Sequence, residues 1–154
     1  MVEQFLSDVK IELNYLDKTS DDIICLINKT EEREINIYDT AAGSMLISQL
    51  YNGIENILKQ ILKFEKIPLP FGANSHIELF LMFTDERTIE NLPILFTNDI
   101  INGFSILRRF RHFTRHGYAY DIDWDRLKLG MKTVEELYNK FKTNLNSYLQ
   151  TKQL

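Results

Sequence analysis

Residues 47–64 of the chain read ISQLYNGIENILKQILKF, and this stretch decides the fold. Its apolar side chains recur every three or four residues without a break, which is the spacing of one face of an α-helix. The repeating positions are Ile47, Leu50, Ile54, Ile57, Ile61 and Phe64. Pro68 and Pro70 follow, and prolines disfavour a helical residue before them. The pattern predicts one long amphipathic helix from about Asp39 to Lys66.

Two further apolar stripes of the same period lie on either side of this helix. The first consists of Val2, Leu6, Val9, Leu13 and Leu16. Its helix either continues through Ser20 or restarts there, because Ser20 can cap a turn that carries Ile23, Ile24 and Ile27. The last stripe begins after about Asp123, passes Gly130, and consists of Leu127, Met131, Val134, Tyr138, Phe141, Leu145 and Tyr148. Both stripes predict long helices.

The segments between these stripes predict shorter helices. Ser75 is a candidate cap for a helix with Ile77, Leu79, Phe80 and Phe83, and a break follows near Pro93. Another helix is expected from about Thr97, with Ile100, Phe104 and Leu107 on its apolar face. No stretch alternates as a strand does, and 154 residues suit one domain. We therefore expect an all-α antiparallel bundle of about five helices over residues 1–154.

The composition is that of a globular protein, with 44% hydrophobic and 26% charged residues. A net charge of −4 gives the whole molecule no general attraction to nucleic acid or to an anionic membrane. The start of the chain lacks the pattern of a secretory signal, and no segment approaches the ~18 apolar residues that cross a membrane. A cytoplasmic protein with no membrane partner is expected. The single cysteine, Cys25, is predicted to be a buried thiol because its neighbours are apolar.

Positive charge is concentrated in one segment of this acidic chain. Four of the seven arginines and two of the three histidines lie close together, at Arg108, Arg109, Arg111, Arg115, His112 and His116. Like charges four apart on a helix, such as Arg111 and Arg115, repel each other. Such a cluster is better suited to binding a phosphate than to packing in a hydrophobic core. The alternative is a solvated helix face that pairs with acidic residues of the next segment, Asp121, Asp123 and Asp125.

These residue types also fit metal-independent cleavage of RNA. Histidine can transfer protons near neutral pH, and arginine can stabilise the charge of the phosphorane. On a regular helix Arg111 and Tyr118 point within about 20° of each other, but His116 lies about 140° away from Arg111. Convergence of the three therefore needs Gly117 to end the helix, or the same residues of a second copy of the chain to complete the site, and we expect both.

Arg111, His116 and Tyr118 match the Arg-x4-His-x-Tyr signature of HEPN ribonucleases of the HepT type. The chain also resembles HepT-like proteins at residues 50–55, at the break at 68–70 and at residues 110–127, and the resemblance covers about residues 35 to 150. It implies a HEPN-like helical domain that forms a homodimer, in which the arginine and histidine of both copies line one cleft. It further implies an endoribonuclease toxin, with tRNA as one candidate substrate, and a nucleotidyltransferase antitoxin of the MNT type that adds AMP to the motif tyrosine.

The resemblance assigns a role to each residue of the motif. Arg111 would stabilise the phosphate charge, His116 would transfer protons, and Tyr118 would position RNA and accept AMP. His112 and Arg115 are the second choices for catalytic or supporting roles, and Arg108 and Arg109, with Arg115, would bind RNA. The competing function is a non-catalytic helical module that binds RNA or docks with a nucleotidyltransferase.

Two residues of the long helix are further candidates, and metal sites are disfavoured. Tyr51 and Glu55 share a helix face, where a buried Glu55 would orient an arginine of the site and an exposed pair would have no such role. His112 and His116 have a spacing that can hold zinc, but the flanking arginines repel a cation. The aspartates at 121, 123 and 125 lack the glycine and glutamate of a calcium loop. We expect no metal and no cofactor.

Overall fold

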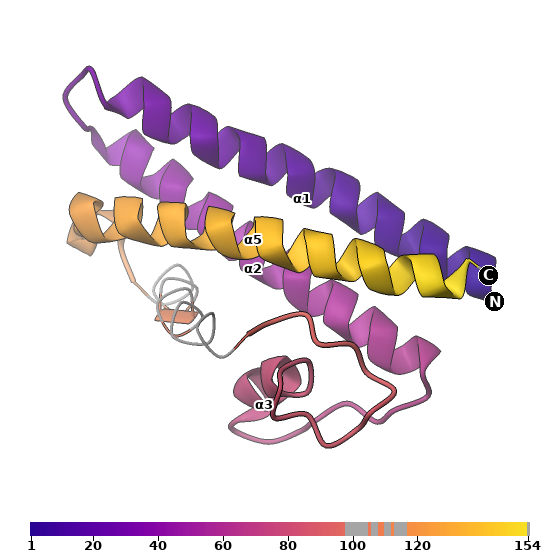
Figure 1. Cartoon of the computed structure of the whole chain (residues 1–154). Coiled ribbons are helices and arrows are strands. Elements are labelled where there is room, and N and C mark those ends of the chain that lie inside the picture. The colour runs from indigo at the N-terminus through magenta and orange to yellow at the C-terminus, as the bar shows by residue number, and fades with distance from the viewer. Residues whose placement is uncertain (98–104, 106–107, 110–111, 113–116, 154) are drawn as a thin grey trace.

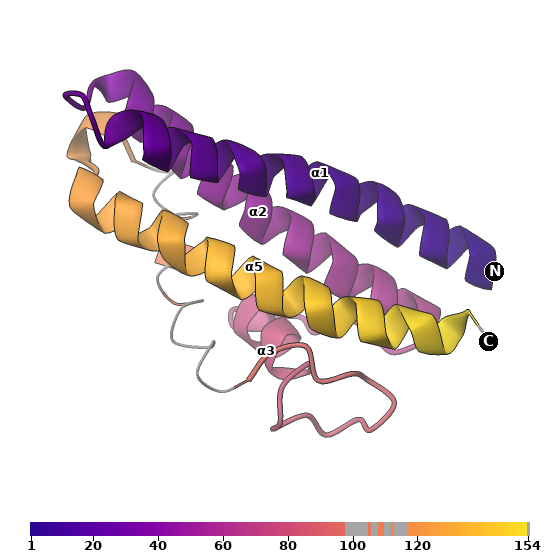
Figure 2. The same ribbon diagram turned by 45° about the horizontal axis from the view of Figure 1, so that its top comes forward.

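Three long helices lie side by side and form the body of the protein (Figure 1). The computed structural model describes residues 1–97, 105, 108–109, 112 and 117–153. Helix α1 (Val2–Thr30) runs antiparallel to α2 (Ile37–Phe64) and to α5 (Trp124–Lys152), and the two chain ends lie at the same end of the bundle (Figures 1 and 2). Every regular element in the described ranges is helical, so the predicted all-α bundle is confirmed.

Helix α1 is uninterrupted, which decides between the two readings of Ser20. Ser20 is 6% exposed inside the helix, whereas a cap would lie at its start. The predicted stripe holds from Val9 onward, but Val2 is 40% exposed and Phe5 is buried in its place. The ring of Phe5 stacks on that of Phe64 at the end of α2, with ring centroids 4.2 Å apart. This contact between two helices sets which face of the first turn is buried.

The prediction of a buried thiol at Cys25 is wrong, because Cys25 is exposed. Its apolar neighbours Ile23 and Ile27 are buried, and each lies two positions from it along the helix. Two residues correspond to about 200° of helical rotation, so Cys25 points away from the side that Ile23 and Ile27 bury.

Helix α2 begins at a capping box and an ion pair. Asn36 Oδ1 accepts a hydrogen bond from the Asp39 backbone N–H, and the Asn36 N–H donates to Asp39 Oδ2. The guanidinium of Arg33 donates to both carboxylate oxygens of Asp39, at 2.7 Å each. The helix ends at Phe64, and Lys66 then adopts a left-handed conformation with φ 59°. The predicted helix of about residues 39 to 66 is therefore found two residues nearer the N-terminus at each end.

Helix α5 is tied to both neighbours by tyrosine hydroxyls. Tyr138 donates to Asp17 of α1 at 2.6 Å, and Tyr148 donates to Glu65 at the end of α2 at 2.6 Å. Burial and the neighbouring carboxylate raise the pKa of both tyrosines well above the usual value. The apolar side chains predicted for this helix are all buried, at Leu127, Met131, Val134, Tyr138, Phe141, Leu145 and Tyr148.

A short helix and an irregular segment cover the side of α2 away from α1 (Figure 2). Helix α3 (Ser75–Leu81) follows Asn74, so Ser75 is its first residue and not its cap. Phe83, predicted within this helix, lies beyond its end and is fully buried. Its carbonyl accepts from the backbone N–H groups of Leu95 and Phe96, which brings residues 95–96 back onto the core. Among the helices described, none combines the length and apolar character needed to cross a membrane.

The pair between Arg33 and Asp39 makes stability depend on pH. The hydrogen bonds from Arg33 and from the Asn36 backbone lower the pKa of Asp39 to about 2, from 3.8. Since this pKa is lower in the folded chain than in the unfolded one, the stabilisation is present above pH 4 and is lost as the pH falls toward 2. Asp39→Asn should therefore be less stable than the parent at pH 7, and the difference should shrink over that interval.

Urea unfolding followed by circular dichroism at several pH values measures this difference. Glu32→Gln, an exposed residue in the same connection between helices, is the matched control and should follow the parent at every pH. A difference between Asp39→Asn and the parent that stays constant from pH 7 to pH 2 would contradict the prediction.

Candidate functional site

The cationic segment is exposed wherever the structure describes it. Arg108, Arg109 and His112 have helical backbone geometry and exposed side chains, as does Ser105 before them. His112 also has a contact within the molecule. Arg111, Arg115 and His116 lie outside the described residues. The solvent-facing arginines 108 and 109 are available to a phosphate from outside the molecule.

Tyr118 follows a bend at Gly117 and is not part of a helix. Its backbone is extended, with φ −111° and ψ 145°, and it immediately precedes the short helix η1 (Ala119–Asp121), which contacts α2. The stripe of a regular helix therefore does not extend to Tyr118, and completion of the site by a second copy of the chain stays a prediction. The side chain is 69% exposed and stacks on Tyr120, with ring centroids 6.0 Å apart and 18° between the ring planes. The phenol is therefore accessible to another molecule.

Tyr51 and Glu55 lie inside the protein, at 1% and 3% exposure. Glu55 Oε1 is 2.7 Å from Nδ1 of His76, a residue of α3 that sequence analysis did not connect with Glu55. A carboxyl oxygen and an imidazole nitrogen at this distance share a hydrogen bond, which links α2 to α3. The burial excludes the exposed pair, and the partner that the structure describes for Glu55 is a histidine; an arginine of the site as its partner stays a prediction.

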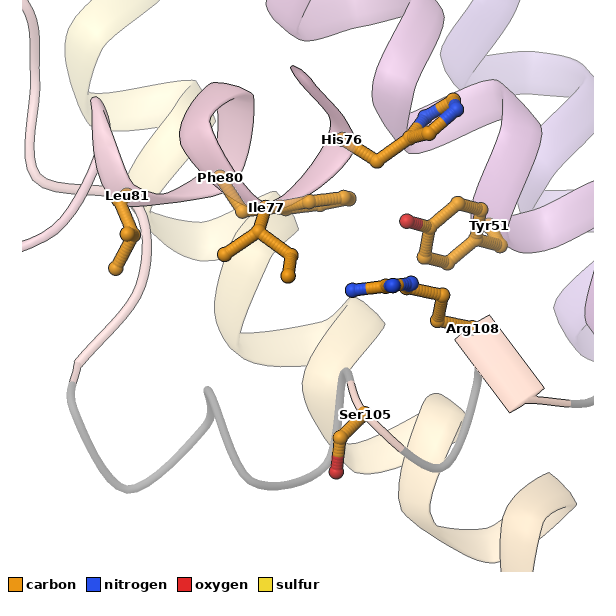
Figure 3. A pocket seen from close by; sticks show the side chains of 7 residues that line it. All are labelled: Tyr51, His76, Ile77, Phe80, Leu81, Ser105 and Arg108. Carbon is orange, nitrogen blue, oxygen red and sulfur yellow. The ribbon is translucent and has the colours of Figure 1, made fainter. Parts of the chain in front are cut away.

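A small cavity opens between α2, α3 and two residues of the cationic segment, Ser105 and Arg108 (Figure 3). Its volume is about 140 Å³, and most of its surface is apolar, from Ile77, Phe80 and Leu81 of α3. Figure 3 shows the Tyr51 hydroxyl and the Arg108 guanidinium pointing into the space that Ile77 and Phe80 face, with His76 at its upper edge. One arginine of the cationic segment therefore lies at the edge of a cavity built by α2 and α3.

The acidic residues of the next segment surround the start of α5. Asp121 belongs to η1, Asp123 is the residue before α5, and Asp125 lies in its first turn. Asp123 holds the capping position but makes no side-chain capping hydrogen bond. In the described part of the chain, no three His, Cys, Asp or Glu side chains gather as a metal ion would require.

Comparison with known proteins assigns the family. A family model described as HepT-like protein matches residues 42–152, most of the chain. The chain belongs to the HepT-like protein family. HepT-like proteins are a HEPN-type toxin family, and the matched range contains every candidate residue from Tyr51 to Tyr118. No curated protein and no solved structure matches the chain significantly.

This HepT-like protein contains a feature that sequence analysis missed, the pair of Glu55 and His76 beside the cavity. The two residues are 21 positions apart, and the proline break at 68–70 separates them. No helical period connects residues on either side of such a break. Only the packing of α3 on α2 brings His76 to Glu55.

The contact between Glu55 and His76 should contribute measurably to stability. His76→Ala leaves a buried carboxylate without its described partner, which should lower the free energy of unfolding by about 1 to 3 kcal/mol. In Glu55→Gln the charge is gone, so His76→Ala made in that background should cost less. Urea unfolding of the four proteins gives this coupling. Equal costs of His76→Ala in the two backgrounds would contradict the role of the pair.

Proposed function

We propose that this HepT-like protein is a toxin that cleaves RNA without a metal ion, through Arg111 and His116. The observation that carries the proposal is that every described residue from Ser105 to Tyr118 is exposed, in the segment that holds the Arg-x4-His-x-Tyr sequence. Membership of a HEPN-type toxin family supports it. An exposed cationic segment on an acidic protein attracts phosphate locally and leaves the rest of the surface unattractive to RNA.

The proposed reaction needs only groups of the chain. The 2′-hydroxyl of a ribose loses its proton to His116 and attacks the adjacent phosphorus, so that a P–O2′ bond forms. The P–O5′ bond breaks, and the leaving oxygen takes a proton from a second imidazole, that of His116 of the partner subunit in a homodimer. Arg111 stabilises the negative charge of the phosphorane with its planar guanidinium. The products end in a 2′,3′-cyclic phosphate and a 5′-hydroxyl. Arg108, Arg109 and Arg115 bind the neighbouring phosphates, and His112 supports the site.

The accessible phenol of Tyr118 suits inhibition by modification. A nucleotidyltransferase of the MNT type would transfer AMP from ATP: the phenol oxygen attacks the α-phosphorus, and pyrophosphate leaves. The product is a phosphodiester with a negative charge and an attached base. Because Tyr118 follows the arginines closely in the sequence, this group would offset their charge and fill the space that RNA needs. Such an antitoxin is therefore the proposed protein partner.

Cleavage assays on the motif variants test the catalytic proposal. Arg111→Ala and His116→Ala should each lower the rate of RNA cleavage by about 100-fold or more, because each removes a group that acts in the transition state. Arg126→Ala, an exposed arginine of α5, should keep the parent rate. The assay contains EDTA, and product ends are identified by mass spectrometry. Parent-like rates in both motif variants would refute the assignment, and RNA bound but never cleaved would favour the non-catalytic module.

Two neighbouring tyrosines provide a matched test of the modification. Tyr118 and Tyr120 are 69% and 77% exposed and stack on each other, so they differ little in accessibility. With ATP labelled at the α-phosphate and a nucleotidyltransferase of the MNT type, Tyr118→Phe should lose the label and Tyr120→Phe should keep it. Labelling of Tyr118→Phe at the parent level would show that another residue accepts AMP.

A further inference from the structure

The cavity between α2 and α3 has the size of one aromatic ring. Its volume is about 140 Å³, and an engineered apolar cavity of roughly 150 Å³ in another protein binds benzene. Pockets for drug-sized molecules are larger, at about 300 to 1,000 Å³. A whole nucleotide therefore does not fit inside, whereas a single six-membered ring does.

The lining of the cavity suits a flat ring attached to an anion. Ile77 and Phe80 provide an apolar and an aromatic surface on one side, and the Tyr51 hydroxyl provides a polar group at depth. The guanidinium of Arg108 lies at the edge, exposed to solvent, where it can stack on a ring or bind a phosphate outside. The Nδ1 atom of His76 is engaged by Glu55, which fixes the imidazole at the other edge.

We propose that this cavity binds one base of the RNA strand, and that its size favours a pyrimidine over a purine. The ribose and phosphate would stay outside, with the phosphate at Arg108. Since Arg108 precedes Arg111 by three residues, the bound nucleotide would lie near the cleaved linkage and would set where the strand is cut. The identity of the ligand as RNA depends on the proposed function, while the cavity itself depends only on the described residues.

The test combines a variant that fills the cavity with RNA that lacks one base. Ile77→Trp places a larger ring at the cavity, and Ile77 is 40% exposed, so the surface can accommodate the change. Ile94→Trp is the matched control, because Ile94 is 39% exposed and does not line the cavity. After the cut site is mapped, each nucleotide around it is replaced in turn by an abasic one, and cleavage rates are measured in EDTA. Thermal unfolding verifies that both variants are folded.

The expected result is coupling between the variant and one nucleotide. For the parent and Ile94→Trp, one abasic position should slow cleavage about tenfold, within the range for a stacked base, and a purine there should slow it less. Ile77→Trp should cleave intact RNA about tenfold more slowly than the parent. For this variant, an abasic nucleotide at the same position should change the cleavage rate less than twofold. Ile77→Trp that keeps the parent rate and the parent dependence on the base would overturn the cavity proposal while cleavage itself stands.

The same comparison separates failure of the cavity from failure of the proposed function. If the parent binds this RNA without cutting it, dissociation constants measured by fluorescence anisotropy replace the rates. Coupling in those constants would support the base site although cleavage is refuted. Equal losses of affinity in parent and Ile77→Trp on removal of the base would overturn it, and so would an absence of RNA binding by the parent.

Discussion

Leu16 of α1 occupies the space that a side chain at residue 53 of α2 would need. A Cβ atom added to Gly53 would lie 2.1 Å from a methyl carbon of Leu16, closer than any unstrained contact. The two helices therefore approach closely at this point, and the apolar stripe of α2 packs directly against α1 on this side. The N-terminal part of α2 approaches α5 in a similar way, where a Cβ on Gly43 would lie 3.0 Å from Leu127. On its other sides α2 contacts α3, which lines the cavity, and η1, which directly follows Tyr118.

The helical stripes could be predicted because each reports a local property, the side of one helix that is apolar. Leu50, Ile54 and Tyr138 are buried as their spacing indicates. The errors occur where burial depends on a partner. Phe5 replaces Val2 in the core because a ring of another helix stacks on it. Cys25 was misjudged because its neighbours in sequence were counted, although neighbours two apart on a helix face different ways.

The candidate site likewise has some features that can be predicted from sequence and others that cannot. Its cationic residues lie in one stretch of sequence, so composition reveals them, and the bend at Gly117 before Tyr118 follows from a single glycine. The cavity cannot be found this way, because Tyr51, Ile77 and Arg108 come from three elements and meet only when the chain is folded. The pair of Glu55 and His76 has the same origin. Sequence thus predicts the charge of the site better than its shape.

The exposed position of Cys25 has a practical consequence. It is the single sulfhydryl of the chain, and it lies on α1, an element that contributes no residue to the cationic segment or to the cavity. A thiol-directed dye or spin label would therefore attach at one defined place on the bundle. Distances between two such labels would test whether two copies of the chain associate, with the arginines and tyrosines of the candidate site left chemically untouched.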